Sequence, residues 1–210
     1  MSIEKHAESF AAPAVDAQGR RDVIGLSRDE LEALMVEVGE PKFRARQLWH
    51  WLYHRGERDF SKMSNLSKDF RGRLEDKFFV GRPGIAVSLA SKDGTHKWVL
   101  EFNDQQKAET VHIPEEDRGT LCVSSQVGCT LTCKFCHTGT QRLVRNLTAN
   151  EIVGQVMMAR DHLGEWPSPP DGRMLSNIVM MGMGEPLYNF DNVAKALKIV
   201  MDGEGIAISK

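Results

Sequence analysis

Three cysteines in the middle of the chain could bind metal through their thiolates. Cys129, Cys133 and Cys136 are spaced C-x3-C-x2-C within the segment GCTLTCKFCHTG. A [4Fe–4S] cluster normally takes four protein thiolates, so three would leave one iron with an open position, as a catalytic zinc site does. The same spacing also suits structural zinc held by the three thiolates and either His137 or Cys122. The spacing by itself therefore leaves both metals open.

Cys122 is a further chemical candidate, because it precedes Cys129 by only seven residues. Alternation along the expected strand places it on a polar face with Ser124 and Gln126. That face could line a cavity near the metal. The competing interpretation is a small, buried apolar residue, which a cysteine often is.

Glu109 is the second candidate, because strand alternation places its carboxylate on an apolar face with Val111 and Ile113. Either that face lines a pocket, or Glu109 lies at an exposed strand end. The pattern by itself favours the exposed strand end.

The elements expected before these residues are helical. Residues 1–24 are polar, Ala-rich and aperiodic, which predicts a disordered lead. A small helical unit is expected over residues 25–80, beginning with a capping box formed by Ser27 and Glu30. Its second helix is predicted over 42–55, with Phe43, Leu48, Trp51 and Leu52 facing inward.

The period then changes to that of strands. Strands are predicted over 85–91, 95–102 and 107–113, with a hairpin turn at Asp93–Gly94. From Gly119 onward strands and helices alternate, which predicts a parallel sheet. The strands expected there span 121–127, 175–181 and 206–209, and a capping box of Thr148 and Glu151 starts the intervening helix.

The composition excludes several classes of protein. With 41% hydrophobic and 27% charged residues among 210, the chain is neither wholly disordered nor fibrous. No apolar run approaches the ~20 residues of a membrane span, and the N-terminus lacks a secretory signal. Four cysteines are too few for a disulfide scaffold, so a cytoplasmic setting is expected.

Any argument for nucleic acid must be local, because the formal net charge is only -2. Between Pro41 and Lys77, ten Lys or Arg residues outnumber five Asp or Glu residues, and Trp49, Trp51 and Tyr53 lie among them. Basic charge with aromatic rings suits phosphate contact and base stacking. A solvated helical face over an aromatic core explains the pattern equally well.

Four segments together carry a family resemblance: CVSSQVGC, CKFCHTG, RNLTANEI and MGMGEPLYN. Over roughly residues 25–210 the chain resembles the RlmN/Cfr group of RNA adenosine methyltransferases, within the radical S-adenosylmethionine (SAM) superfamily. The resemblance implies an α/β fold whose partial radical SAM (β/α) barrel occupies residues 118–210. Before the barrel it implies a helical, RNA-binding accessory domain at 25–80 and an antiparallel β segment at 81–117.

The resemblance also implies a cofactor site. Cys129, Cys133 and Cys136 would ligate a [4Fe–4S] cluster whose open iron binds SAM. Gly184, Glu185 and Pro186 match the motif that meets the SAM amino group. This match is chemically sensible, because Glu185 offers an acceptor and glycine allows the backbone to approach a ligand closely.

Two catalytic roles are implied in the same way. Glu109 matches the proposed proton acceptor, and Cys122 matches the thiol that resolves a protein–RNA crosslink. The implied reaction is methylation of C2 of adenosine in 23S rRNA and in tRNA, at the adenosine 3′ to the anticodon. In such enzymes two SAM molecules, a methyl-carrier cysteine and an electron donor such as flavodoxin take part.

Two alternatives stay open: a Cfr-like C8 methyltransferase, and a non-catalytic zinc- or RNA-binding protein. All four cysteines are assigned, so none remains for the methyl carrier, which in the family lies near the C-terminus. The chain is therefore interpreted as an N-terminal part of such an enzyme, monomeric when full length and with no membrane partner. Alone it is expected to bind the cluster weakly and to transfer no methyl group.

Overall fold

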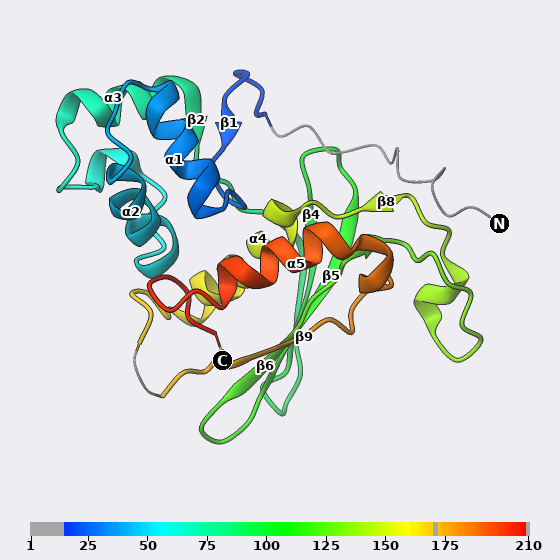
Figure 1. Cartoon of the computed structure of the whole chain (residues 1–210). Coiled ribbons are helices and arrows are strands. Elements are labelled where there is room, and N and C mark those ends of the chain that lie inside the picture. Colours follow the sequence, from blue (N-terminus) through cyan, green and yellow to red (C-terminus); the bar gives the residue numbers. More distant parts are fainter. Residues whose placement is uncertain (1–14, 170–171, 209–210) are drawn as a thin grey trace.

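The fold, in the computed structural model, is described for residues 15–169 and 172–208. A mixed sheet stands at the centre, a group of short helices lies to one side, and the loop that carries three cysteines projects on the other (Figure 1). The helices are α1 (Arg28–Glu37), α2 (Arg44–Trp49), α3 (Lys68–Lys77), α4 (Ala149–Leu163) and α5 (Phe190–Val200). The strands are β1 (Arg21–Asp22), β2 (Phe78–Phe79), β3 (Gly84–Ala90), β4 (His96–Glu101), β5 (Lys107–Pro114), β6 (Gly119–Cys122), β7 (Gln126–Val127), β8 (Arg145–Asn146) and β9 (Asn177–Val179).

Ordered structure begins earlier than the sequence suggested. β1 pairs in parallel with β2, and Val23 and Ile24 behind it are buried. The predicted disorder is therefore wrong for residues 15–24, while residues 1–14 lie outside the described part. Two apolar residues are too few to show a period, so the pairing that orders them left no signal.

In the helical group, residues 25–80, the first helix forms as predicted and the second differs from its prediction. The capping box at Ser27 and Glu30 is present, which satisfies free N–H groups at the start of α1. The second helix is α-helical only to Trp49 and continues as a π-helical turn, His50–His54. Phe43 is 62% exposed, so its predicted inward direction is wrong. It lies at the N-cap of α2, where its ring stacks under the Arg44 guanidinium.

The central sheet joins the antiparallel segment to the β/α series, which were predicted to be separate units. Its order is β3-β4-β5-β6-β9, with every pair antiparallel except β6–β9, which is parallel. The turn at Asp93–Gly94 is confirmed, with Gly94 at φ +85° and the Asp93 carboxylate accepting the Thr95 N–H. The expected antiparallel segment thus continues directly into the first strand of the β/α series.

The two faces of the sheet differ in burial. Helix α4 covers one face, where Thr110 donates to the Gln155 amide at 2.8 Å and Trp98 packs against His162. The other face is open in the described chain. The register aligns one row of half-buried or exposed side chains across all five strands of this open face: Leu89, Lys97, Val111, Cys122 and Val179.

The predicted strands after Gly119 are shorter than expected. The strand predicted over 121–127 breaks after Cys122, and residues 126–127 form β7, which pairs with β8. The strand predicted over 206–209 is wrong for residues 206–208, and Ser209 lies outside the described residues. Ile206 and Ile208 are buried because this segment turns back, with the Ile208 N–H bonded to the carbonyl of Val200. Within residues 15–169 and 172–208, no helix is long and apolar enough to cross a membrane.

Candidate cofactor and catalytic site

Strands β6 and β9 deliver two segments that run side by side beyond their carboxyl ends. The N–H of Val123 bonds to the carbonyl of Val179, and the N–H of Gly182 bonds back to Val123, both at 3.0 Å. The Met183 carbonyl then accepts N–H groups from Ser125 and Gln126 at 2.8 and 3.1 Å. The region outside the carboxyl ends of parallel strands is where α/β sheets bind ligands.

Ser124 connects these segments to the strand that carries Glu109. Its hydroxyl accepts the Met183 N–H at 2.8 Å and donates to the Glu109 carbonyl at 2.6 Å. The side chain is fully buried, and its backbone N–H is bonded to Gln155 of α4. A buried hydroxyl with both roles satisfied holds three backbone segments at fixed spacing.

The three cysteines lie together on the loop between β7 and β8. All are free thiols and half-buried. Gly139 packs so closely that an added Cβ would lie 2.6 Å from the carbonyl oxygen of Cys133. Hydrogen bonds from the backbone N–H groups of Gly139 and Thr138 hold the pKa of Cys136 below its ordinary value. A thiolate is the form that binds metal.

The donor set fits an iron–sulfur cluster. The loop borders an open hollow of about 450 Å³, lined by Cys129, Thr130, Thr132, Gly139, Thr140, Gln141, Arg142 and Leu143. Among the described residues, no group of three or more His, Cys, Asp or Glu side chains is placed to hold a single metal ion. The thiolates of a cluster bind different irons, so they need not converge on one ion.

Arg145 anchors the end of this loop. Its guanidinium, 1% exposed, pairs with Asp104 at 2.7 Å and with Glu151 at 2.8 Å. Hydrogen bonds donated by the same guanidinium lower the pKa of Asp104. Glu151 also accepts the Thr148 N–H in the capping box of α4, which is confirmed. Arg145 therefore ties the end of the cysteine loop to the β4–β5 turn and to the first turn of α4.

The Gly184–Glu185–Pro186 turn lies against the base of the cysteine loop. Gly184 has φ +98°, and a Cβ there would lie 2.5 Å from the Cβ of Gln126. The Glu185 N–H donates to the Gln126 amide oxygen at 3.0 Å. The Glu185 carboxylate caps the short helical turn that follows, accepting the Leu187 N–H at 3.1 Å.

Glu109 and Cys122 share the open face of the sheet. Val111 is paired with Cys122, so Glu109, two residues earlier, lies on the same side. The Glu109 carboxylate is half-exposed and pairs with the Lys97 ammonium at 2.7 Å. Burial raises the pKa of the Cys122 thiol, partly offset by a hydrogen bond from the Met181 backbone. Glu109, Val111 and Ile113 therefore lie on the less buried of the two faces of β5, where Ile113 is 45% exposed.

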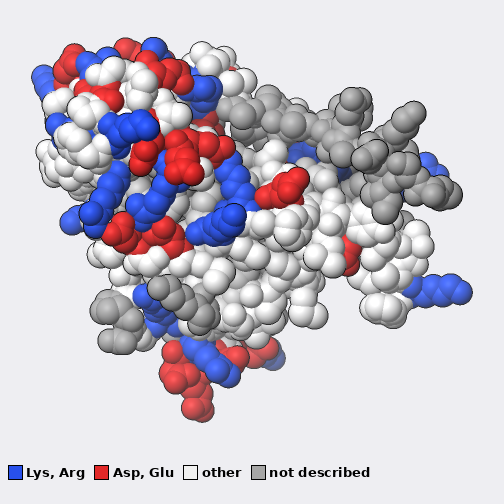
Figure 2. Space-filling view, viewed as in Figure 1, with Lys and Arg blue, Asp and Glu red and all other residues white. Residues whose placement is uncertain are grey.

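The aromatic part of the predicted RNA surface is wrong for two residues. Trp49 and Tyr53 are buried in the core at 2% and 0% exposure, so neither ring can stack on a base. Trp51 stays partly exposed and lies under the Arg55 guanidinium. The basic residues are interspersed with acids over α1–α3, so no single-sign patch forms on the face shown in Figure 2. Several of them form ion pairs: Lys42–Glu32, Arg44–Glu40, Arg46–Glu204 and Arg73–Asp69.

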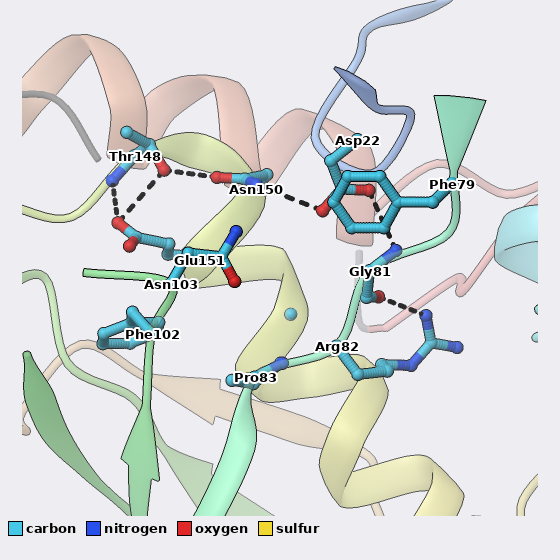
Figure 3. A pocket seen from close by; sticks show the side chains of 11 residues that line it. Asp22, Phe79, Gly81, Arg82, Pro83, Phe102, Asn103, Thr148, Asn150 and Glu151 are labelled. Carbon is cyan, nitrogen blue, oxygen red and sulfur yellow. Dashed lines mark hydrogen bonds between the residues drawn. The ribbon is translucent and has the colours of Figure 1, made fainter. Parts of the chain in front are cut away.

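A separate cavity of about 110 Å³ lies where the helical group meets α4 (Figure 3). Asp22 points into it and accepts the Gly81 N–H at 2.9 Å and the Asn150 amide at 3.3 Å. None of the four cysteines lines this cavity. Its contacts serve to join the two parts of the chain.

Four residues of the site were not assigned roles from the sequence: Lys97, Ser124, Gln126 and Arg145. Ser124 and Gln126 were predicted only to lie with Cys122 on a polar face of the strand. That pattern was informative, because a buried polar side chain must find partners. Arg145 pairs with Asp104 in the β4–β5 turn and with Glu151 in α4, and these partners left no pattern in the sequence that singles out Arg145. The partner of Lys97 lies on another strand, β5, and left none either.

The chain is similar in sequence to known RNA methyltransferases. Residues 21–80 match the family described as "Ribosomal RNA large subunit methyltransferase N-terminal domain". The chain is 63% identical over 202 residues to the "Dual-specificity RNA methyltransferase RlmN" of Rhizorhabdus wittichii, covering 94% of this chain and 50% of that protein. It is 64% identical to the protein of the same name from Rhodospirillum rubrum, covering 96% of this chain and 49% of that protein.

A solved structure is also similar. A radical SAM methyltransferase from Sphaerobacter thermophilus superposes with a TM-score of 0.79 at 38% identity, covering 90% of this chain and 54% of that one. The chain spans about half the length of the curated relatives it matches. Over that half, the comparisons lead to one conclusion: the chain is similar in sequence to RlmN RNA methyltransferases and shares the α/β fold of a radical SAM methyltransferase.

Proposed function

We propose that this chain provides the cluster- and SAM-binding part of an RNA methyltransferase that methylates C2 of adenosine in 23S rRNA and tRNA. The observation that carries the proposal is the convergence of the cysteine loop and the Glu185 turn beyond β6 and β9, held together through Gln126. The names of the relatives support an RNA substrate.

The residues have distinct proposed tasks. Cys129, Cys133 and Cys136 hold the cluster, and the Glu185 region accepts hydrogen bonds from the ammonium group of SAM. When bound, cluster and SAM supply radical chemistry that ordinary acid–base catalysis cannot, which C2 of adenine requires because it is a poor nucleophile.

Glu109 and Cys122 act on the RNA in this proposal. Glu109 takes the proton from C2, and its half-exposed place on the open face supports access to a base. Cys122, once it has lost its proton, attacks the sulfur that links protein to product. An S–S bond forms, the bond from that sulfur to the transferred carbon breaks, and its electron pair passes into the adenine ring. Protonation of the transferred carbon then frees the methylated RNA. All four cysteines of the chain are then in use, so the methyl-carrier cysteine belongs to the part of the relatives that this chain does not span.

Anaerobic iron–sulfur reconstitution tests the cofactor half of the proposal. Iron and sulfide are measured per chain, and EPR spectra of the reduced protein are recorded with and without SAM. A [4Fe–4S] signal that shifts on adding SAM is the expected result. One zinc per chain with no sulfide would support the non-catalytic alternative, and a cluster that ignores SAM would contradict a SAM site in this chain.

Two cysteine variants sharpen this test. Cys133→Ala is expected to lower bound iron to a small fraction of the wild-type content, because it removes one of three thiolate ligands. Cys122→Ala is the matched control and should keep the wild-type iron content and EPR signal. Equal loss of iron in both variants would argue that Cys122 is a ligand.

A further inference from the structure

Gln126 is a fully buried side chain whose hydrogen bonds join three segments of the candidate site. Its amide nitrogen donates to the Thr130 hydroxyl at 2.9 Å and to the Asn146 side chain at 2.8 Å. Its amide oxygen accepts the Glu185 N–H at 3.0 Å and the Thr130 N–H at 3.2 Å. Both donors and both acceptor positions of the amide are therefore used.

The partners of Gln126 are the segments that the proposed cofactor site must align. Thr130 directly follows Cys129 on the cysteine loop, and Asn146 lies on β8, where that loop ends. Glu185 lies 59 residues away in sequence, in the turn after β9. Asn146 extends the connection by donating to the Tyr188 carbonyl at 3.2 Å.

Packing reinforces these hydrogen bonds. Gly184 approaches so closely that a Cβ would lie 2.5 Å from the Cβ and 2.6 Å from the Cγ of Gln126. The backbone N–H of Gln126 also bonds to the Met183 carbonyl. Movement of the Glu185 turn relative to Cys129 would therefore require both a lost hydrogen bond and a repacked side chain.

Resting on the proposed function, we propose that Gln126 is a positioning residue: it sets the distance between the cluster-binding loop and the Glu185 turn. An amino acid held at an open iron must reach both elements at once. Gln126 touches neither cofactor in this proposal. It acts by preorganising the two elements, which lowers the cost of ordering them when the ligand binds.

Three variants test the role. Gln126→Asn shortens the side chain by one methylene, so the amide can no longer reach Glu185, Thr130 and Asn146 together. Gln126→Glu keeps the length and the oxygen acceptors, so it should restore the bond from the Glu185 N–H, while it loses the two donated bonds to Thr130 and Asn146. Gln47→Asn is the matched control: it makes the same change in α2, outside the site, where the amide oxygen accepts a hydrogen bond from Arg44.

The first measurement is hydrogen exchange in the full chain without cluster. In Gln126→Asn, exchange at the Glu185 amide should rise about tenfold, while Gln126→Glu, which keeps the acceptor, and Gln47→Asn should leave it within about threefold of wild type. Unchanged exchange at Glu185 in Gln126→Asn would overturn the positioning role, whatever the cofactor chemistry.

The second measurement is SAM affinity, from titration of the SAM-dependent EPR shift in reconstituted protein. Gln126→Asn should keep the wild-type iron content and weaken SAM binding about tenfold, the effect of losing one well-made hydrogen bond. The control Gln47→Asn should bind within about threefold of wild type. Equal weakening by Gln47→Asn, or no weakening by Gln126→Asn, would overturn the role. Wild-type protein that shows no SAM-dependent shift would overturn the proposed function itself, while the exchange result still reports whether Gln126 holds Glu185.

Discussion

At the scale of single residues, two buried ionisable side chains, Arg145 and Asp22, differ in whether an opposite charge is paired with them. Arg145 is paired with two carboxylates, and the hydrogen bonds that it donates to both offset its loss of water. Asp22 instead accepts N–H groups and one amide, and burial raises its pKa. Removing a partner of Arg145 would leave a buried charge unpaired, whereas neutralising Asp22 would remove a charge that the fold disfavours.

The raised pKa of Asp22 predicts a pH-dependent stability. Because the folded state favours the protonated form, this group's contribution is fully present below the unfolded pKa and is lost as pH rises through the folded pKa. Asp22→Asn should therefore gain stability relative to wild type as pH rises from about 4 toward neutrality. Urea unfolding at a series of pH values measures this difference.

Asp93→Asn is the control for that series, because its sign is opposite. A hydrogen bond from the Thr95 N–H lowers the pKa of Asp93. Its contribution is present above the unfolded pKa and is lost as pH falls. A difference between wild type and Asp22→Asn that did not vary with pH would contradict the assigned effect of burial.

At the scale of elements, close backbone approach decides where β1, α1 and α4 meet. Gly25 links β1 to α1 with φ +80°, and a Cβ there would lie 2.5 Å from the backbone of Asn150 in α4. Gly39 follows α1 with a similar φ of +76°, but open space surrounds it. Comparing alanine substitutions at Gly25 and Gly39 therefore separates two free-energy costs: that of the left-handed backbone conformation and that of the steric contact with α4.

Alanine at these two glycines should therefore destabilise the protein unequally. Gly39→Ala should lower the free energy of unfolding by about 1–2 kcal/mol, the cost of a left-handed conformation. Gly25→Ala should lower it by about 2–5 kcal/mol, because overpacking against a helix backbone adds to that cost. Chemical denaturation of both variants checks this, and equal losses would show that α4 moves away without cost.

At the scale of the whole molecule, the helical group and the sheet share one continuous hydrophobic core, from Val23 to Ile208. Polar contacts strengthen the junction. Arg28 of α1 pairs with Asp202 beyond α5 at 2.7 Å and stacks over Trp49 at 4.5 Å from the ring centre. Asp22 bonds to Asn150 of α4 on the other side of the junction (Figure 3).

A shared core predicts a single cooperative unfolding transition, although the sequence suggested separate units. Far-UV circular dichroism and tryptophan fluorescence should give the same midpoint in urea. Trp49 reports on the helical group and Trp98 on the sheet. Variants in which Trp51 and Trp166 are replaced and only one of Trp49 and Trp98 is kept therefore give matched probes. Midpoints that differ between the two probes would show that the helical group unfolds independently.

The sequence by itself determined the local features of this protein. Capping boxes, the Asp93–Gly94 turn and the placing of three thiols on one loop follow from residue type and short spacing, and the structure has each of them. The four motif segments also sufficed to predict the similarity to RlmN methyltransferases that the comparisons confirm. These features depend on contacts within a few residues, where chemistry and spacing leave few alternatives.

Only the tertiary structure decided how distant segments meet. It paired β1 with β2, joined the antiparallel strands to β6, buried Trp49 and Tyr53, and folded Ile206–Ile208 back onto α5. It also placed Glu185 against Gln126 across 59 residues. Such contacts form because the whole chain must bury its apolar side chains and give every buried polar group a hydrogen-bond partner. These partners come from distant parts of the chain, so a short stretch of sequence does not reveal them.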